Sequence, residues 1–333
     1  MYSYDKESET ILNQEFPPNL LHLEITQKCN FKCKHCYFKN IKQATSSELP
    51  VIKFKKILKQ AYRLGVTNII LTGGEPLLHP NFLEIYNYAY TLFGNRITIN
   101  SNGSFVTKKI LDTFKKKPPM LIRITLYGVD NITYRKITGK AAYTTVLNNL
   151  KSLKKFNLEL RTLPLYQLKK YFKKLDNLSL NFTKKRIEFN PIIIGKNARK
   201  VSLSTHDLFD LFCNRYKINL KVLKHSAEVF NCSAGIRSFH IDSKGNMGLC
   251  FLLRKKRVKA LPNLRIAFKT LKYIRQSYIK KFKKCASCKY RNICFWCPGF
   301  AEQEIKSFDP KSSNSAKIPR LCKLAKLFFN NCY

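Results

Sequence analysis

Short apolar runs alternate with amphipathic segments through the first two thirds of the chain. Runs such as Leu20–Thr26 have the length of buried strands, whereas the segments between them repeat apolar residues every three or four positions, as helices do. Gly65 follows the first such segment and is a plausible C-terminal helix cap. This pattern predicts strands at 20–26, 68–71, 96–100, 121–126, 158–163 and 186–194, and helices at 50–64, 81–93, 108–115, 143–155 and 168–175.

Six alternations of strand and helix are typical of parallel βαβ units and predict an α/β fold. A complete eight-fold barrel needs about 250 residues. We therefore expect a partial (β/α)6 TIM-like barrel over residues 20–217, preceded by an N-terminal extension of residues 1–19. In such folds the active site lies at the carboxyl ends of the strands.

The pattern changes after about residue 217. The apolar segments 238–241 and 247–249 flank the turn-rich run Asp242-Ser243-Lys244-Gly245, which predicts a hairpin. The remainder is basic, rich in cysteine and poor in long periodic segments. Such a segment has too little apolar core to fold alone. We expect residues 218–333 to form a small cysteine-rich α+β domain held together by metal.

The chain contains 12 cysteines, most of them in closely spaced groups. The polar N-terminus has no apolar core of signal-peptide length, and no run approaches the roughly 18 apolar residues of a membrane helix. These features favour a cytoplasmic location and argue against a membrane. In a reducing compartment, grouped cysteines indicate metal or redox chemistry rather than disulfides.

The formal net charge is +42, and it is unevenly distributed. Residues 243–301 contain 16 Lys or Arg residues and no Asp or Glu. A field of this kind attracts nucleic acid, an acidic peptide or an acidic partner protein. Many of these lysines are equally consistent with solvated surface, and cations would also compensate the negative charge of iron–sulfur clusters.

The strongest chemical signal is Cys29-x3-Cys33-x2-Cys36, directly after the first predicted strand. Three thiolates can hold three irons of a four-iron cluster and leave the fourth iron open to a small molecule. The alternative is a zinc knuckle or a chance cluster of cysteines. The spacing resembles the CxxxCxxC signature of the radical S-adenosylmethionine (SAM) enzymes, in which this cluster binds SAM.

The resemblance extends to further motifs. Gly73-Gly74-Glu75-Pro76 matches the GGEP motif of the family, which implies contact with the SAM amino group, and glycine permits close backbone approach. Thr125-Leu126-Tyr127-Gly128 lies where relatives often carry Ser-Leu-Asp-Gly, so Tyr127 is a departure. The resemblance, together with the position of polar residues at strand ends, makes the SAM-binding candidates His35, Gly73, Gly74, Glu75, Pro76, Asn100, Asn102, Thr125 and Arg161. A structural salt bridge is an equal alternative for Arg161.

The C-terminal cysteines occur in the pattern Cys232-x12-Gly245-x4-Cys250, then Cys285-x2-Cys288-x5-Cys294-x2-Cys297, and finally Cys322. This pattern resembles the SPASM domain, which carries two auxiliary four-iron clusters. One departure is the x2 between Cys294 and Cys297, where the family usually has x3. Structural zinc is the alternative for CxxC pairs, and Cys213 and Cys332 remain unassigned. By analogy, the first auxiliary cluster would use Cys232, Cys250 and Cys297, and the second Cys285, Cys288, Cys294 and Cys322.

The resemblance implies an enzyme that reductively cleaves SAM to a 5′-deoxyadenosyl radical, which abstracts hydrogen from a substrate. The expected cofactors are SAM, a SAM-binding [4Fe-4S] cluster and two auxiliary [4Fe-4S] clusters. The leading substrate is a ribosomally made peptide or small protein, of acidic character, that is oxidatively cross-linked through a thioether or carbon–carbon bond. A low-potential electron donor, flavodoxin or ferredoxin, and a separate leader-binding protein are the expected partners.

Other substrates remain open. Tetrapyrrole or other small-molecule side-chain modification uses the same architecture. Nucleic-acid modification is suggested only by the positive charge, so nucleic acid is not an expected partner. Phe251 follows Cys250 where anaerobic sulfatase-maturing enzymes have an acid, which argues against that activity. No catalytic residue is assigned from the sequence.

Overall fold

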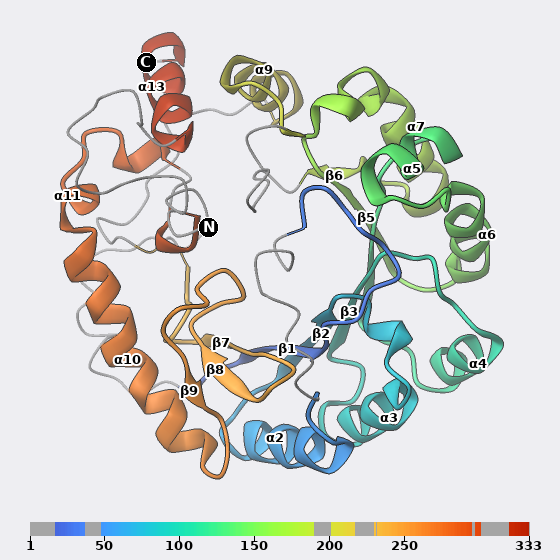
Figure 1. Cartoon of the computed structure of the whole chain (residues 1–333), viewed down its shortest axis with the longest axis vertical. Helices are drawn as coiled ribbons and strands as arrows, with labels where there is room; N and C mark the ends of the chain where they lie inside the picture. Colours follow the sequence, from blue (N-terminus) through green and yellow to red (C-terminus); the bar gives the residue numbers. More distant parts are fainter. Residues whose placement is uncertain are drawn as a thin grey trace.

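One nine-stranded sheet organises the part of the chain that the structure, a computed structural model, describes. The strand order is β6-β5-β4-β3-β2-β1-β7-β8-β9 (Figure 1). Curving of the sheet produces an open partial barrel, so the expected α/β fold class is confirmed. The described residues are 17–36, 48–189, 201–216, 230, 232–294, 297–300 and 320–332.

The six predicted barrel strands are present, and neighbouring strands pair in parallel. Parallel pairing places all their carboxyl ends at one edge of the sheet, where the cysteine loop and the glycine loop begin. Residues 190–194 of the last predicted strand lie outside the described residues. The strands are β1 (Leu20–Thr26), β2 (Asn68–Gly73), β3 (Ile97–Ser101), β4 (Leu121–Thr125), β5 (Leu158–Thr162) and β6 (Glu188–Phe189).

Amphipathic helices cover the outer face of this sheet (Figure 1). In α2, for example, Phe54, Ile57 and Leu58 are fully buried, as their three- and four-residue spacing predicts. The predicted helix at 168–175 is instead a 3-10 helix, η3 (Tyr166–Tyr171), that continues into an α-helix. The outer helices are α2 (Val51–Arg63), α3 (Phe82–Phe93), α4 (Lys108–Lys116), α6 (Tyr143–Leu153) and α7 (Phe172–Thr183).

A further helix, α5 (Asn131–Thr138), was not predicted. Its start is defined by a capping box, in which the Asp130 side chain accepts from N of Thr133 at 2.7 Å. Its end is defined by Gly139 in the left-handed conformation. Both signals are visible in the sequence, but the helix has only eight residues and therefore little periodicity.

The predicted C-terminal hairpin is confirmed, and it joins the barrel sheet. Strand β7 (Ser238–Ile241) pairs in parallel with β1, and β8 (Asn246–Gly248) returns antiparallel to β7. A two-residue strand, β9 (Val258–Lys259), follows. Gly245 has a φ of 78° in the turn, where a side chain would be strained. Strand β1 is therefore an interior strand of the sheet, flanked by β2 and β7.

The expectation that the C-terminal region lacks long periodic segments is wrong. Helix α10 (Leu264–Lys281) has 18 residues and buries Leu264, Ala267, Leu271 and Tyr278. Arg275 occupies a position of the same buried stripe, and this charge hid the apolar period in the sequence. Helices α9 (Thr205–Tyr216) and α13 (Arg320–Cys332) pack against each other in this half of the molecule.

The boundary predicted at residue 217 lies among residues that the structure does not describe, so the division into domains stays a prediction. Among the described helices, none is long and apolar enough to cross a membrane.

Candidate functional site

The loop of Cys29, Cys33 and Cys36 begins where β1 ends. Its opposite side is fixed by α5, because N of Lys32 donates to O of Thr138 at 2.7 Å and N of Lys34 donates to O of Ile137 at 3.0 Å. N of Cys36 also donates to O of Cys33 at 3.2 Å. Backbone hydrogen bonds therefore hold the loop at the carboxyl edge of the sheet, between β1 and α5.

The three thiols of this loop lie near the hydroxyl group of Tyr127. Burial raises the pKa of Tyr127 well above its usual value, and the neighbouring Cys33, Cys29 and Cys36 raise it further. His35 stacks on Tyr127 with ring centroids 5.3 Å apart. The departure at Tyr127 thus supplies an aromatic partner for His35, the residue predicted to lie beside the adenine of SAM.

The two glycines of the GGEP motif allow the β2 loop to lie directly against the cysteine loop. A Cβ atom on Gly73 would lie 2.2 Å from O of Thr26, and one on Gly74 would lie 2.3 Å from O of Lys28. N of Gly74 donates to O of Thr26 at 2.9 Å, and N of Glu75 donates to O of Lys28 at 2.8 Å. Only glycine permits this approach of two backbones.

Glu75 connects the β2 loop to the β3 loop. Its buried carboxylate accepts from Oγ of Ser101 at 2.8 Å, from N of Asn102 at 2.6 Å and from N of Leu77 at 3.1 Å. Burial raises the pKa of Glu75 to about 7, and the three hydrogen bonds oppose that rise. An ammonium group bound beside this carboxylate would favour its charged form.

Asn102 carries the connection on to the cysteine loop. Its Nδ2 donates to Oδ1 of Asn30 at 3.0 Å and lies 3.7 Å from Sγ of Cys29. Nδ2 of Asn30 in turn donates to Oγ of Ser104 at 2.7 Å. The loops after β1, β2 and β3 therefore form one hydrogen-bonded unit around Cys29.

The remaining SAM-binding candidates lie on adjacent strands. Asn100 is on β3, and its buried Oδ1 has no hydrogen-bond partner among the described residues. Thr125 on β4 is in register with Arg161 on β5. Arg161 forms an ion pair with Glu159, which also lies 3.2 Å from Arg123. The salt-bridge alternative for Arg161 is thus realised, and its two roles are compatible because Arg161 retains further donors.

Cys232, Cys250 and Cys297 come together from three loops. A Cβ atom on Gly235, near Cys232, would meet Leu249 at 2.3 Å, and one on Gly299, near Cys297, would meet Leu252 at 3.0 Å. Burial is the main cause that raises the pKa of Cys250 to about 11 and that of Cys297 to about 12, and the neighbouring thiols add to the rise. Thiols in such surroundings stay protonated unless a metal binds them.

A second group consists of Cys285 on the short helix α11 (Lys283–Ala286), Cys288 in the following turn and Cys294 directly after η5 (Arg291–Ile293). Burial raises the pKa of Cys285, and its neighbours Cys288 and Cys294 raise it further.

Cys322 lies on α13, which packs beside this second group through Tyr290 and Phe329, whose ring centroids are 5.2 Å apart. Cys213 lies on α9, which packs on α13. No three His, Cys, Asp or Glu side chains in the described ranges have the spacing that a single metal ion requires.

Buried arginines beside the C-terminal cysteines were missed in the sequence. Nη1 of Arg275 donates to O of Cys232 at 3.2 Å, and Nη2 of Arg257 donates to O of Cys250 at 3.1 Å. Arg291 is 4% exposed. Burial lowers the pKa of its guanidinium, and neighbouring cysteines of both groups oppose that shift. In a chain with 62 Lys and Arg residues, nothing in the sequence distinguishes these three from surface cations.

Comparison with known proteins identifies the N-terminal half. Residues 23–168 match the family model of the radical SAM superfamily. The matched segment includes the cysteine loop, the glycine loop and strands β2 to β5. The chain therefore contains a radical SAM domain, as its N-terminal motifs predicted.

Individual relatives differ in the reactions that their names describe. The antilisterial bacteriocin subtilosin biosynthesis protein AlbA of Bacillus subtilis is 25% identical over 262 residues, 73% of this chain and 57% of AlbA. A probable GTP 3′,8-cyclase of Sulfurisphaera tokodaii is 24% identical over 287 residues, 78% of this chain and 90% of the cyclase. The chain thus spans little more than half the length of AlbA and most of the cyclase.

Among solved structures, Streptococcus suis SuiB bound to its precursor peptide SuiA superposes with a TM-score of 0.64. The alignment covers 93% of this chain and 78% of SuiB at 17% identity. At this identity the likeness shows the fold alone, and it extends beyond the barrel into the C-terminal region.

The residues at the carboxyl edge fit the cofactors that the superfamily implies, a [4Fe-4S] cluster and SAM. Three thiols near Tyr127 provide the donors that a four-iron cluster prefers. The buried acceptor Oδ1 of Asn100 and the carboxylate of Glu75 suit the hydroxyl and ammonium groups of SAM. The stacked rings of His35 and Tyr127 offer an aromatic surface for a base.

Proposed function

We propose that this protein is an enzyme that reductively cleaves SAM and abstracts a hydrogen atom from its substrate. The observation that carries the proposal is the joining of the three-thiol loop, the glycine loop and the Asn102 loop into one hydrogen-bonded unit within a radical SAM domain. When bound, the cluster and SAM together supply a 5′-deoxyadenosyl radical.

The residues of the protein would bind the cluster and orient SAM on it. Cys29, Cys33 and Cys36 hold the cluster, and Asn102, which donates toward Sγ of Cys29, reduces the negative charge on that sulfur. Glu75 keeps the β2 and β3 loops in register and attracts the SAM ammonium. The half-buried ring of Tyr127 offers His35 a stacking partner beside the thiols.

We infer that the C-terminal region binds two further four-iron clusters, as in SPASM proteins. The three loops that carry Cys232, Cys250 and Cys297 pack against one another, which supports a first auxiliary site. Cys288 and Cys294 lie close enough to Cys285 to raise its pKa, and the helix of Cys322 packs beside this group. Both observations support a second auxiliary site. On this proposal, residues 218–333 form the auxiliary-cluster domain.

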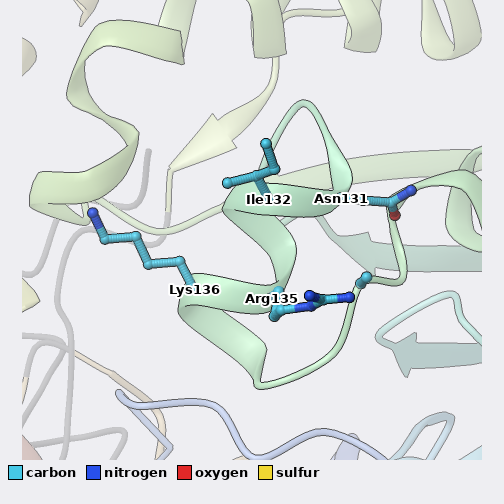
Figure 2. Close-up of a pocket in the computed structure, with 5 residues that line it drawn as sticks. Asn131, Ile132, Arg135 and Lys136 are labelled. Atoms are coloured by element: carbon cyan, nitrogen blue, oxygen red, sulfur yellow. The ribbon is translucent and has the colours of Figure 1, made fainter.

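The substrate that we propose is a peptide with acidic residues. Figure 2 shows a pocket of about 370 Å³ on α5, lined by Asn131, Ile132, Arg135, Lys136 and Ala141. Ile132 is 80% exposed and lies one helical turn before the cationic Arg135 and Lys136, and the far end of α5 bonds to the cysteine loop. An apolar side chain next to two cations suits a peptide with an apolar side chain next to acidic ones.

Names of relatives support two of the three substrate classes that the sequence left open. AlbA takes part in making a bacteriocin, and SuiB binds a precursor peptide, which favours a peptide substrate. The cyclase relative, of which this chain covers 90%, favours a small molecule as the second candidate. A cytoplasmic location, the electron donor and the leader-binding partner remain predictions.

Anaerobic incubation of the iron-reconstituted protein with SAM and dithionite tests the reaction. We expect 5′-deoxyadenosine and methionine in equal amounts, and none from a Cys29→Ala variant. Failure of fully reconstituted protein to form 5′-deoxyadenosine would sink the proposal.

The substrate class is tested separately by the binding of a fluorescein-labelled glutamate- and leucine-rich peptide at physiological salt. Weaker binding is expected for Ile132→Asn/Lys136→Glu, with Lys272→Glu on α10 as the charge-matched control. Equal weakening in both variants would mean nonspecific attraction by the positive charge, and would favour the small-molecule candidate.

A further inference from the structure

A buried charge network connects the first barrel strand to the loop of Cys250. Glu24 on β1 is fully buried, and its carboxylate forms two hydrogen bonds with the guanidinium of Arg254, one of them 3.0 Å long. Nε2 of His240 on β7 lies 2.9 Å from the same carboxylate. The two partners of Glu24 are more than 200 residues away in the chain, so this contact spans both halves of the sequence.

A second arginine extends the network. Nη1 of Arg257 lies 3.0 Å from Nδ1 of His240 and 3.4 Å from Oδ2 of Asp242. Because a guanidinium can only donate, Nδ1 of the neutral ring accepts, and the ring hydrogen is on Nε2, the ring nitrogen nearer to Glu24. Burial lowers the pKa of His240 to about 4, so the ring is neutral at physiological pH. Two carboxylates thus balance two guanidinium groups.

The other donors of both arginines bind the backbone of the Cys250 loop. Nε of Arg254 donates to O of Phe251 at 2.8 Å. Nη2 of Arg257 donates to O of Cys250 at 3.1 Å, and its Nε donates to O of Leu253 at 3.3 Å. Between β8 and β9 this loop has no helix or strand of its own. Side-chain donors therefore satisfy the carbonyl groups of the loop, which backbone N–H groups would satisfy in a helix or strand.

We propose that Glu24, Arg254 and Arg257 are positioning residues that fix the Cys250 thiolate in the first auxiliary cluster relative to the barrel. The inference rests on the proposed function, because it requires that cluster. Arg254 pairs with Glu24 on β1, Arg257 pairs with Asp242 in the turn between β7 and β8, and both arginines also bind carbonyls of the loop. The distance from Cys250 to β1 is thereby set by two side chains rather than by the path of the loop.

Stability alone does not account for this arrangement. Replacing a buried ion pair with apolar residues of similar size is often neutral or stabilising. Glu24 is fully buried, so an apolar residue of similar size at this position would also be shielded from water. The charged side chains lie where the donors that Arg254 and Arg257 do not use for carboxylates bind carbonyls of the Cys250 loop.

Arg254→Lys is the sharpest test, because lysine keeps the charge but cannot bind Glu24 and O of Phe251 in the same geometry. Arg123→Lys is the matched control, an interior arginine that pairs with Glu159 and does not contact the Cys250 loop. We expect a changed electron paramagnetic resonance spectrum and reduction potential for one auxiliary cluster in Arg254→Lys only. Formation of 5′-deoxyadenosine without substrate should stay within about two-fold of wild type, a difference of less than 1 kcal/mol in barrier.

A double variant, Glu24→Leu/Arg254→Met, covers the case in which a single change prevents folding, since it removes both charges together. It should fold, as judged by circular dichroism, and lose or alter the same auxiliary signal. Spectra and iron content equal to wild type in both variants would overturn the inference and leave the proposed function intact. A wild-type protein with only the four or so irons of the SAM cluster would overturn the auxiliary cluster and this inference with it.

Discussion

Cys33 and Cys250 are both buried or half-buried thiols on irregular loops, but the molecule holds them by different means. The loop of Cys33 is fixed by backbone hydrogen bonds to α5 and by glycines that let β2 approach within van der Waals contact. The loop of Cys250 is fixed by Arg254 and Arg257, whose guanidinium groups bind its carbonyls. The Cys33 loop is thus held mainly by backbone groups, with side chains of Glu75 and Asn102 joining the neighbouring loops, whereas the Cys250 loop is held by side chains.

This difference predicts different weaknesses. A site built from backbone tolerates most side-chain changes but not an added Cβ atom at a close approach. A site built from buried ionic side chains depends on each of them, because loss of one partner leaves another charged group unsatisfied. Substitutions in the two halves should therefore separate SAM cleavage from auxiliary-cluster chemistry.

The largest effect is expected from cysteine substitutions. Cys29→Ala should reduce 5′-deoxyadenosine formation to background, because the SAM-binding cluster loses a ligand. Cys285→Ala should remove about four irons per chain and leave SAM cleavage without substrate measurable. Chromatographic assay of 5′-deoxyadenosine beside iron analysis measures both. Equal loss of SAM cleavage in the two variants would break the comparison, since it would mean that the halves act as one unit.

A glycine substitution in the barrel should have the next largest effect. In Gly73→Ala the new Cβ would meet O of Thr26 at 2.2 Å, and the φ of 152° adds strain. We expect a loss of about 3 kcal/mol in the free energy of unfolding, with weaker SAM binding. Gly94→Ala is the control, because its φ is also positive but nothing lies within 4 Å of the added Cβ. It should cost about 1 kcal/mol, measured by urea unfolding.

The barrel was predictable from the sequence because local and long-range signals agree there. Leu21, Leu23 and Ile25 alternate along the segment Leu20–Thr26 and are fully buried. Helices α2 and α3 have clear periods and are followed by Gly65 and Gly94. The loops follow strand ends, so the meeting of Cys29 with Gly73 and Asn102 follows from parallel topology alone.

The C-terminal region was less predictable for a physical reason. Its buried stripe on α10 includes Arg275, and its loops are held by arginines that look like any others in a chain with a net charge of +42. The pairing of β7 with β1 is also invisible locally, because it joins segments more than 200 residues apart. The one available signal was Glu24, an acid within an apolar strand, which must find a buried partner.

Substitution of Arg275 should have a smaller effect, and it tests the C-terminal loops that side chains hold in place. Its guanidinium donates to O of Ala234 at 2.7 Å and to O of Cys232, and it stacks on Phe230. Arg275→Met should cost about 2 kcal/mol, because two buried carbonyls lose their donors while the stem still packs. Lower occupancy of the first auxiliary cluster is expected, with normal 5′-deoxyadenosine formation. Full iron content in this variant would show that α10 and not the guanidinium orders the Cys232 loop.

The smallest effect is expected from pH, and it compares one histidine from each region. Burial lowers the pKa of His22, with help from Arg123, and that of His240, in each case to about 4 from an ordinary value of 6.5. His22 lies on β1 in register with His240 on β7, and the latter faces Glu24, Arg254 and Arg257. Both rings are therefore neutral in the folded protein throughout the range in which the unfolded chain takes up protons.

Stability must then fall as pH falls from 6.5 toward 4, because the unfolded state binds more protons. Between pH 6.5 and 5.5 each histidine should cost about 1 kcal/mol. The measurement is the midpoint of urea unfolding at several pH values, for wild type and for His22→Gln and His240→Gln. Each variant should lose about half of the pH dependence that these two residues cause. A variant at His240 that keeps the full dependence would mean that Glu24 stabilises the imidazolium, and the network would then carry a net positive charge beside Cys250.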